Sequence, residues 1–316
     1  MESDQADQSA IRDPLARVPR QSAIRIGLAL SSGGARGFAH VGVIKALREA
    51  GFTIGSVAGS SMGSIMAAGY AIRGDAAELE RRVLDFRARD HMRRLLPVMD
   101  PARITAFLDD ILGGAHFADC AVPLAIVATD LRERLPMTLN EGSVARAAFA
   151  SSAVPFVHRP VRWGERLLAD GSLSCVLPTA QAQTDEVDLV IGSLVSRPLT
   201  ALHGVVGGVA RNVGGVIRGW GRPYVEYFRD HLPQLAWPEA ASDARATAPV
   251  LILSPQLDRI GPLDFARVRE LIAAGEEAVW SRIDEIGVLL AQKGERANGR
   301  GETAPLNPPN TGGTLR

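Results

Sequence analysis

Two short apolar runs in the first part of the chain each lead directly into a glycine-containing turn and then a helical segment. Residues 24–30 precede Ser-Ser-Gly-Gly, and residues 54–58 precede Gly-Ser-Ser-Met-Gly. Continuous apolar runs without polar alternation are typical of strands in a parallel sheet that is covered on both faces. Further runs lie at 124–129, 187–194 and 250–253. This alternation predicts an α/β fold, a three-layer sandwich with a mostly parallel central sheet.

The two ends of the chain differ in composition from its middle. Residues 1–22 are polar, and residues 294–316 are dense in Gly, Pro and Asn. Both are expected to be disordered tails. Residues 23–293 contain no internal repeat and are expected to form a single domain.

Charge and hydropathy restrict the partners and the location. The chain has 35 basic and 35 acidic residues, so no overall field attracts nucleic acid. Its first residues lack the basic region and apolar stretch of a secretory signal. No window of about 18 apolar residues is long enough to span a bilayer. The expectation is a cytoplasmic protein with no nucleic-acid partner.

The turn after the second apolar run has the pattern of a nucleophile elbow. Gly59, Ser61 and Gly63 form a Gly-x-Ser-x-Gly motif between an expected strand and an expected helix. In such an elbow the flanking positions must be small, and the serine hydroxyl is exposed at the sheet edge beside a helix N-terminus. Ser61 is therefore predicted to be a nucleophile.

The turn after the first run contains Gly33, Gly34, Arg36 and Gly37. Consecutive glycines allow backbone N–H groups to converge on a negative charge. The loop could bind a dinucleotide or a nucleotide phosphate, or form an oxyanion hole. The dinucleotide pattern fails because Ser32 replaces its first glycine, and the Gly-Lys-Ser/Thr of a P-loop is absent. An oxyanion hole fits best, since both turns leave neighbouring parallel strands at one sheet edge.

A third element, Asp170-Gly171, follows the apolar residues 167–169. By itself, an aspartate before a glycine could be no more than a turn residue. Asp130, at the end of another expected strand, is a second candidate base, although fixing a neighbouring turn is its simpler role.

Together these elements resemble the patatin-like phospholipase family, particularly its bacterial members. The likeness includes Ser-Gly-Gly-Ala-Arg-Gly, Gly-Ser-Ser-Met-Gly, the segments 128–131 and 150–155, and Asp170-Gly171. It implies a patatin-like hydrolase domain over 23–293 that cleaves lipid esters as a phospholipase A or lysophospholipase does, through an acyl-enzyme. It also implies that no metal or other cofactor is needed. Ser172 departs from the family pattern, which usually has Gly or Ala there.

The resemblance assigns a role to each motif residue. Ser61 and Asp170 would form a catalytic dyad without histidine, and the backbone around Gly33, Gly34 and Arg36 would form the oxyanion hole. Gly37, Gly59, Gly63 and Gly171 would be motif glycines.

Two other interpretations stay open. An α/β-hydrolase triad would need the chain order Ser, Asp, His, which His203 or His231 could complete. A non-catalytic lipid-binding or regulatory protein could keep the same fold.

The role of residues 199–248 is not evident from the sequence. Within them, 205–220 combines valines at helical spacing with two arginines and a tryptophan, a pattern that could rest peripherally on the inner membrane. Packing on the core, or covering an acyl channel, is the simpler alternative.

Overall fold

The computed structural model describes residues 24–88, 101–196, 222–231 and 248–299. Within them, one eight-stranded sheet has the strand order β5-β6-β3-β2-β1-β7-β8, with β4 paired to β3. The strands are β1 (Arg25–Leu30), β2 (Thr53–Ser60), β3 (Leu124–Asp130), β4 (Leu135–Leu139), β5 (Val161–Trp163), β6 (Arg166–Ala169), β7 (Leu189–Ser193) and β8 (Val250–Leu253). Neighbours among β3, β2, β1, β7 and β8 are parallel, and β4, β5 and β6 are antiparallel to their neighbours.

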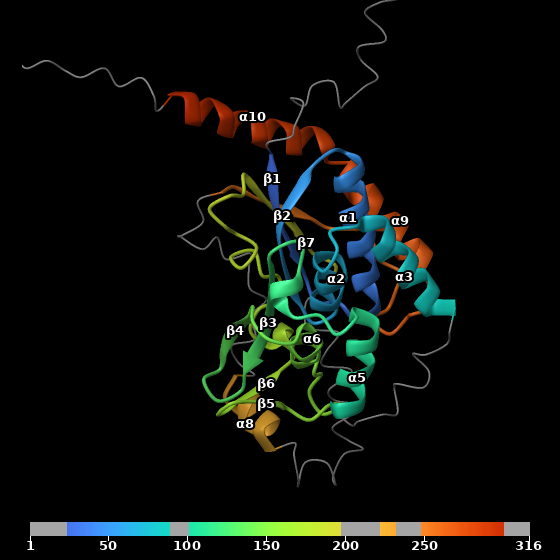
Figure 1. Ribbon diagram of the computed structural model, residues 1–316, viewed down its shortest axis with the longest axis vertical. Coiled ribbons are helices and arrows are strands. Elements are labelled where there is room, and N and C mark those ends of the chain that lie inside the picture. Colours follow the sequence, from blue (N-terminus) through green and yellow to red (C-terminus); the bar gives the residue numbers. More distant parts are fainter. Residues whose placement is uncertain (1–23, 89–100, 197–221, 232–247, 300–316) are drawn as a thin grey trace, which may run out of the picture.

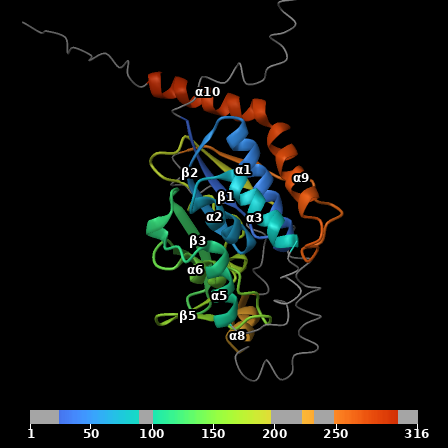
Figure 2. The same cartoon turned by 45° about the vertical axis from the view of Figure 1, so that its right-hand side comes forward.

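The described residues also form eight α-helices. They are α1 (Ala39–Glu49), α2 (Met62–Ala71), α3 (Ala76–Ala88), α5 (Pro101–Leu112), α6 (Val144–Ser151), α8 (Arg222–His231), α9 (Val268–Trp280) and α10 (Ile283–Gly299). All except α8 contribute buried side chains to the main core. In Figures 1 and 2, α1, α3 and α9 lie together on one side of β1 and β2.

On the face of β1 opposite the main core, small side chains allow close packing. In β1, Leu28 belongs to the main core, whereas Ala29 packs in a separate cluster with Ala182. A Cβ on Gly27 would lie 2.3 Å from the carbonyl oxygen of Ala182. The segment 177–187 can therefore pack directly on the strands, and it covers this face without a helix of its own.

The packing of α1 on α9 depends on two glycines. A Cβ on Gly42 would lie 1.9 Å from the carbonyl oxygen of Ile272, and one on Gly275 would lie 1.9 Å from that of Ala39. Such contacts require the two helix backbones to touch. On the same helix pair, the Lys45 ammonium lies 2.9 Å from the Glu276 carboxylate.

The α/β class with a mostly parallel central sheet is confirmed. The apolar runs at 54–58, 124–129, 187–194 and 250–253 correspond to β2, β3, β7 and β8. The antiparallel strands β4, β5 and β6 were not expected, because each is only three to five residues long and the apolar run at 167–169 does not reveal an antiparallel partner.

The structure describes only part of the expected chain ends and none of the expected membrane segment. α10 continues to Gly299, past the boundary expected at residue 293. The remaining tail residues and the segment 205–220 lie outside the described residues. None of the described helices has the length and apolar character that crossing a membrane requires.

We predict that Gly42→Ala destabilises the fold, because its methyl group would push α9 away from α1. Overpacking of this kind costs about 1–3 kcal/mol. Urea unfolding measures the effect, and Gly261→Ala is the matched control, since a Cβ there meets nothing within 4 Å. Equal stability of the two variants would contradict the direct helix contact.

Candidate active site

Ser61 occupies a strained turn between a strand and a helix. β2 ends at Ser60 and α2 begins at Met62, with Ser61 between them at φ 52° and ψ −124°. A positive φ is uncommon for a residue with a side chain and is held only by its surroundings. A Cβ on Gly59 would lie 2.4 Å from the Gly63 carbonyl oxygen, so only glycine at position 59 allows the chain to reverse this tightly.

Asp170 lies next to Ser61 because the C-terminal ends of β2 and β6 approach each other along β3. Ser60 of β2 is in register with Val127 of β3, and Ala169 of β6 is in register with Thr129. β4 occupies the opposite edge of β3, so β2 and β6 share one edge. β2 is parallel and β6 antiparallel to β3, so their C-terminal ends approach, separated by two β3 residues or about 6.6 Å. The next residue of each chain segment enters the site.

The hydroxyl of Ser61 donates a 2.7 Å hydrogen bond to Oδ2 of Asp170. Both residues are buried: 9% of the surface of Ser61 and 3% of the surface of Asp170 is exposed to solvent. The other carboxylate oxygen, Oδ1, accepts from the amide of Ser172 at 2.9 Å. A Cβ on Gly171 would lie 2.1 Å from the Val127 carbonyl oxygen, so glycine is needed for the turn to fit against β3.

Two further hydroxyl groups hold the backbone of Ser61 and Asp170 in place. Ser151, at the end of α6, accepts from the Ser61 amide at 2.8 Å and donates to the Val127 carbonyl at 2.6 Å. Thr129 donates to the carbonyl of Asp170 at 2.8 Å. Both residues lie in segments, 128–131 and 150–155, that the sequence singled out without giving them a role.

Burial sets the electrostatics of the aspartate. Removal from water raises the pKa of Asp170 above its ordinary value, against the opposing effect of hydrogen bonds from Ser172 and Ser61. A raised pKa makes the ionised carboxylate a stronger base. An aspartate with an ordinary pKa would accept a serine proton less readily at neutral pH.

The glycine loop lies beside the elbow. A Cβ on Gly37 would lie 2.3 Å from Cγ of Met62, the residue after Ser61. Within the described part of the chain, the amides of Gly33 and Gly34 have no hydrogen-bond acceptor. The amide of Arg36 donates back to the Gly33 carbonyl at 3.3 Å. The two glycines therefore offer the open donors of this loop.

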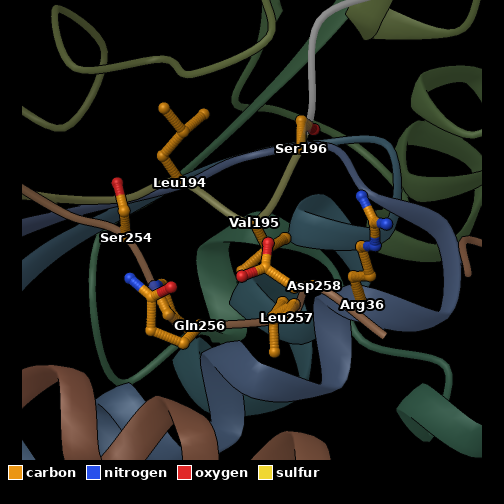
Figure 3. Close-up of a pocket in the computed structure, with 9 residues that line it drawn as sticks. Arg36, Leu194, Val195, Ser196, Ser254, Gln256, Leu257 and Asp258 are labelled. Carbon is orange, nitrogen blue, oxygen red and sulfur yellow. The ribbon is translucent and has the colours of Figure 1, made fainter. Parts of the chain in front are cut away.

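The segment around residue 260 anchors the glycine loop from outside. Nε of Arg36 donates to the Ile260 carbonyl at 2.7 Å, and the Ala35 amide donates to the Pro262 carbonyl at 2.8 Å. Figure 3 shows the Arg36 side chain at the wall of a pocket shared with the ends of β7 and β8. The pocket is lined by Arg36, Leu194, Val195, Ser196, Ser254, Pro255, Gln256, Leu257 and Asp258. Of the predicted site residues, only Arg36 lines it.

His40 holds the start of the glycine loop. Its ring is fully buried and bridges the Ser193 hydroxyl through Nδ1 and the Ser31 carbonyl through Nε2, both at 2.8 Å. A carbonyl can only accept, so Nε2 carries the proton and Nδ1 accepts from Ser193. Burial lowers the pKa of His40 to about 4, which keeps the ring neutral at physiological pH.

The other candidate residues lie apart from this chemistry. Asp130 pairs with Arg166 at 2.7 Å and accepts from the Arg132 amide, so it fixes the turn after β3. His158 accepts from the Val154 amide through Nδ1.

The two histidines considered for a triad cannot be placed: His203 and the side chain of His231 lie outside the described residues. Among the described residues, no group of His, Cys, Asp and Glu side chains is arranged to hold a metal ion.

Comparison with known proteins gives one family. The model of the family described as patatin-like phospholipase matches residues 28–182, which include the glycine loop, Ser61 and Asp170. The NTE family protein Rv1063c of Mycobacterium tuberculosis is 37% identical over 202 residues, 62% of this chain and 54% of that protein. The chain thus spans about half the length of this relative.

More distant matches extend over more of the chain. Lysophospholipase NTE1 of Coccidioides immitis is 25% identical over 266 residues, which are 79% of this chain and 17% of that protein. Among solved structures, VipD from Legionella pneumophila has a TM-score of 0.40 at 13% identity, covering 80% of this chain and 67% of that one. The family model and the NTE relatives agree with the motifs and support the assignment of residues 28–182 to the patatin-like phospholipase family.

Proposed function

We propose that this protein is a serine lipid acyl hydrolase of the phospholipase A or lysophospholipase type. Ser61 is the nucleophile, Asp170 the base, and the amides of Gly33 and Gly34 form the oxyanion hole. The observation that carries the proposal is the 2.7 Å hydrogen bond from the Ser61 hydroxyl to the Asp170 carboxylate inside a buried elbow. The name of the Coccidioides relative, lysophospholipase, supports the substrate class.

Acylation begins as Ser61 Oγ attacks the ester carbonyl carbon and its proton passes to Asp170 Oδ2. The carbonyl oxygen becomes negative and is stabilised by the two glycine amides. One such donor contributes about 3–4 kcal/mol in comparable sites. When the tetrahedral intermediate collapses, the bond to the leaving alcohol breaks and Asp170 returns the proton to that oxygen.

Deacylation repeats the same steps with water. Asp170 accepts a proton from a water molecule that attacks the acyl-enzyme carbonyl, and a second oxyanion forms in the same place. Collapse breaks the bond to Ser61 Oγ, which recovers the proton from Asp170 as the fatty acid leaves. No metal or organic cofactor enters either half-reaction.

The direct contact favours a dyad over a triad. In a triad, a histidine lies between the serine and the acid. Here Oδ2 of Asp170 accepts from Ser61 itself and Oδ1 accepts from the Ser172 amide. A non-catalytic lipid-binding protein would not need Ser61 in a strained conformation with an accepting carboxylate at hydrogen-bond distance.

We predict that Ser61→Ala and Asp170→Asn each lower esterase turnover at least about a thousandfold, because each removes one half of the proton-transfer pair. Turnover of a lysophospholipid and labelling by a fluorophosphonate probe measure the effect. Ser60→Ala is the matched control at the neighbouring position. Wild-type turnover by Ser61→Ala would contradict the assignment of the nucleophile.

The control variant carries its own prediction. Within the described residues the buried Ser60 hydroxyl has no hydrogen-bond partner. An unsatisfied buried hydroxyl costs about 1–3 kcal/mol. Ser60→Ala should therefore keep its activity and unfold at the same or a higher denaturant concentration than the wild type. A clear loss of stability would show that this hydroxyl has a partner.

The raised pKa of Asp170 gives a pH prediction with a definite sign. A buried aspartate with a raised pKa favours folding only while it is protonated, and this contribution is lost as pH rises through the folded pKa. Asp170→Asn should accordingly be more stable than the wild type at neutral pH, and the difference should shrink as pH falls. Thermal unfolding from pH 7 toward acid measures it. A difference that grows on acidification would contradict burial as the dominant effect.

A further inference from the structure

Helix α8 packs beside the turn that contains Asp170. Tyr224 and Tyr227, 0% and 3% exposed, join Leu131, Phe156, Ala169 and Leu173 in a cluster separate from that core. Ala169 directly precedes Asp170, and Leu173 follows it by three residues. In Figures 1 and 2, α8 lies at the end of the molecule formed by β5 and β6. The two aromatic rings therefore pack on the chain segments that carry the carboxylate.

The tyrosine hydroxyls also bind the backbone on both sides of the site. The Tyr227 hydroxyl donates to the Leu173 carbonyl at 2.8 Å, within the Asp170 turn. The Tyr224 hydroxyl donates to the His158 carbonyl at 3.2 Å, and its ring lies 5.5 Å from that of Phe156. Phe156 has φ 64°, a strained conformation that must be held by its contacts.

The pKa of the Tyr224 phenol depends on its burial and on Asp170. Burial, and next the negative charge of Asp170, raise the pKa of the Tyr224 phenol. The phenol is consequently neutral over the working pH range and acts as an apolar wall with a hydrogen-bond donor at its edge.

We propose that α8 is a cover for the proposed base: Tyr224 and Tyr227 are positioning residues that exclude water from the Asp170 turn and hold its backbone. The inference rests on the proposed function of Ser61 and Asp170 and adds to it. It assigns a catalytic purpose to a helix within 199–248, the part of the sequence that carried no motif. The exclusion of water that raises the pKa of Asp170 would then come from a helix more than fifty residues away in the chain.

The other titratable groups near Asp170 should not determine the acid limb of the pH profile. At the end of β3, Asp130 is paired with Arg166. His158 has a pKa that burial lowers, so it is uncharged near neutral pH. Following the turn, Cys175 has a pKa that burial raises to about 11, so its thiol is also neutral. The ionisation of Asp170 itself should therefore dominate the acid limb of the pH profile.

The test compares alanine with phenylalanine at one position in the full-length protein. Tyr224→Ala opens the wall to water, so the acid limb of kcat/KM for p-nitrophenyl butyrate should move to lower pH. The value of kcat at pH 7 should fall by on the order of tenfold, as expected for a weaker base. Tyr224→Phe keeps the ring and should keep the wild-type acid limb. Val225→Ala, on the exposed side of the same helix, is the control and should change neither quantity.

The rate of Ser61 labelling by a fluorophosphonate, measured over the same pH range, should shift with the acid limb. Tyr227→Ala repeats the test from the second ring if Tyr224→Ala does not fold. A uniform loss of activity at every pH, tracking the folded fraction, would overturn the inference and leave the dyad intact. Failure of the dyad itself appears separately, as a wild-type protein that the probe does not label.

Discussion

The hydrogen bond between Ser61 and Asp170 is the interaction on which the rest of the site depends. The two residues are 109 positions apart, and each is the first residue after a strand. They meet because β2 and β6 run toward each other along one edge of β3. A parallel strand alone would deliver the serine but not the acid. The short antiparallel end of the sheet thus supplies the second half of the proposed catalytic pair.

Keeping this pair in place is costly to the fold. Ser61 has a positive φ, Asp170 is an acid nearly removed from water, and the Ser60 hydroxyl has no partner within the described residues. Each feature opposes folding by an amount on the order of 1–3 kcal/mol. The large core between the sheet and its helices offsets them. Functional sites commonly hold such destabilising features, and here they gather within two adjacent turns.

The sequence predicted the parallel part of the fold well and the antiparallel part poorly. Runs such as 54–58 and 250–253 have the continuous apolar pattern of doubly covered strands, so their positions could be predicted. β6 has four residues with an apolar run at 167–169, but nothing in so short a run indicates that it pairs antiparallel with β3. The small side chains Gly27 and Ala29 indicate close packing on the second face, but not that the irregular segment 177–187 provides it.

The candidate site shows the same division. Gly59, Ser61 and Gly63 have a local signature, because one turn imposes all three. Asp170 alone was ambiguous as a turn residue, and only its resemblance to a family motif suggested a role. Ser151 lies in a segment that the family likeness includes, but its contacts, like those of the α8 tyrosines, join residues distant in sequence and could not be predicted from spacing.

Trapping of the acyl-enzyme tests the account most directly. The protein would be mixed with a lysophospholipid, quenched in acid during turnover, digested, and its peptides weighed by mass spectrometry. The account predicts a peptide containing Ser61 that is heavier by the mass of the acyl group. Release of fatty acid with an acyl group on another residue, or with no acylated peptide at any time during turnover, would contradict it.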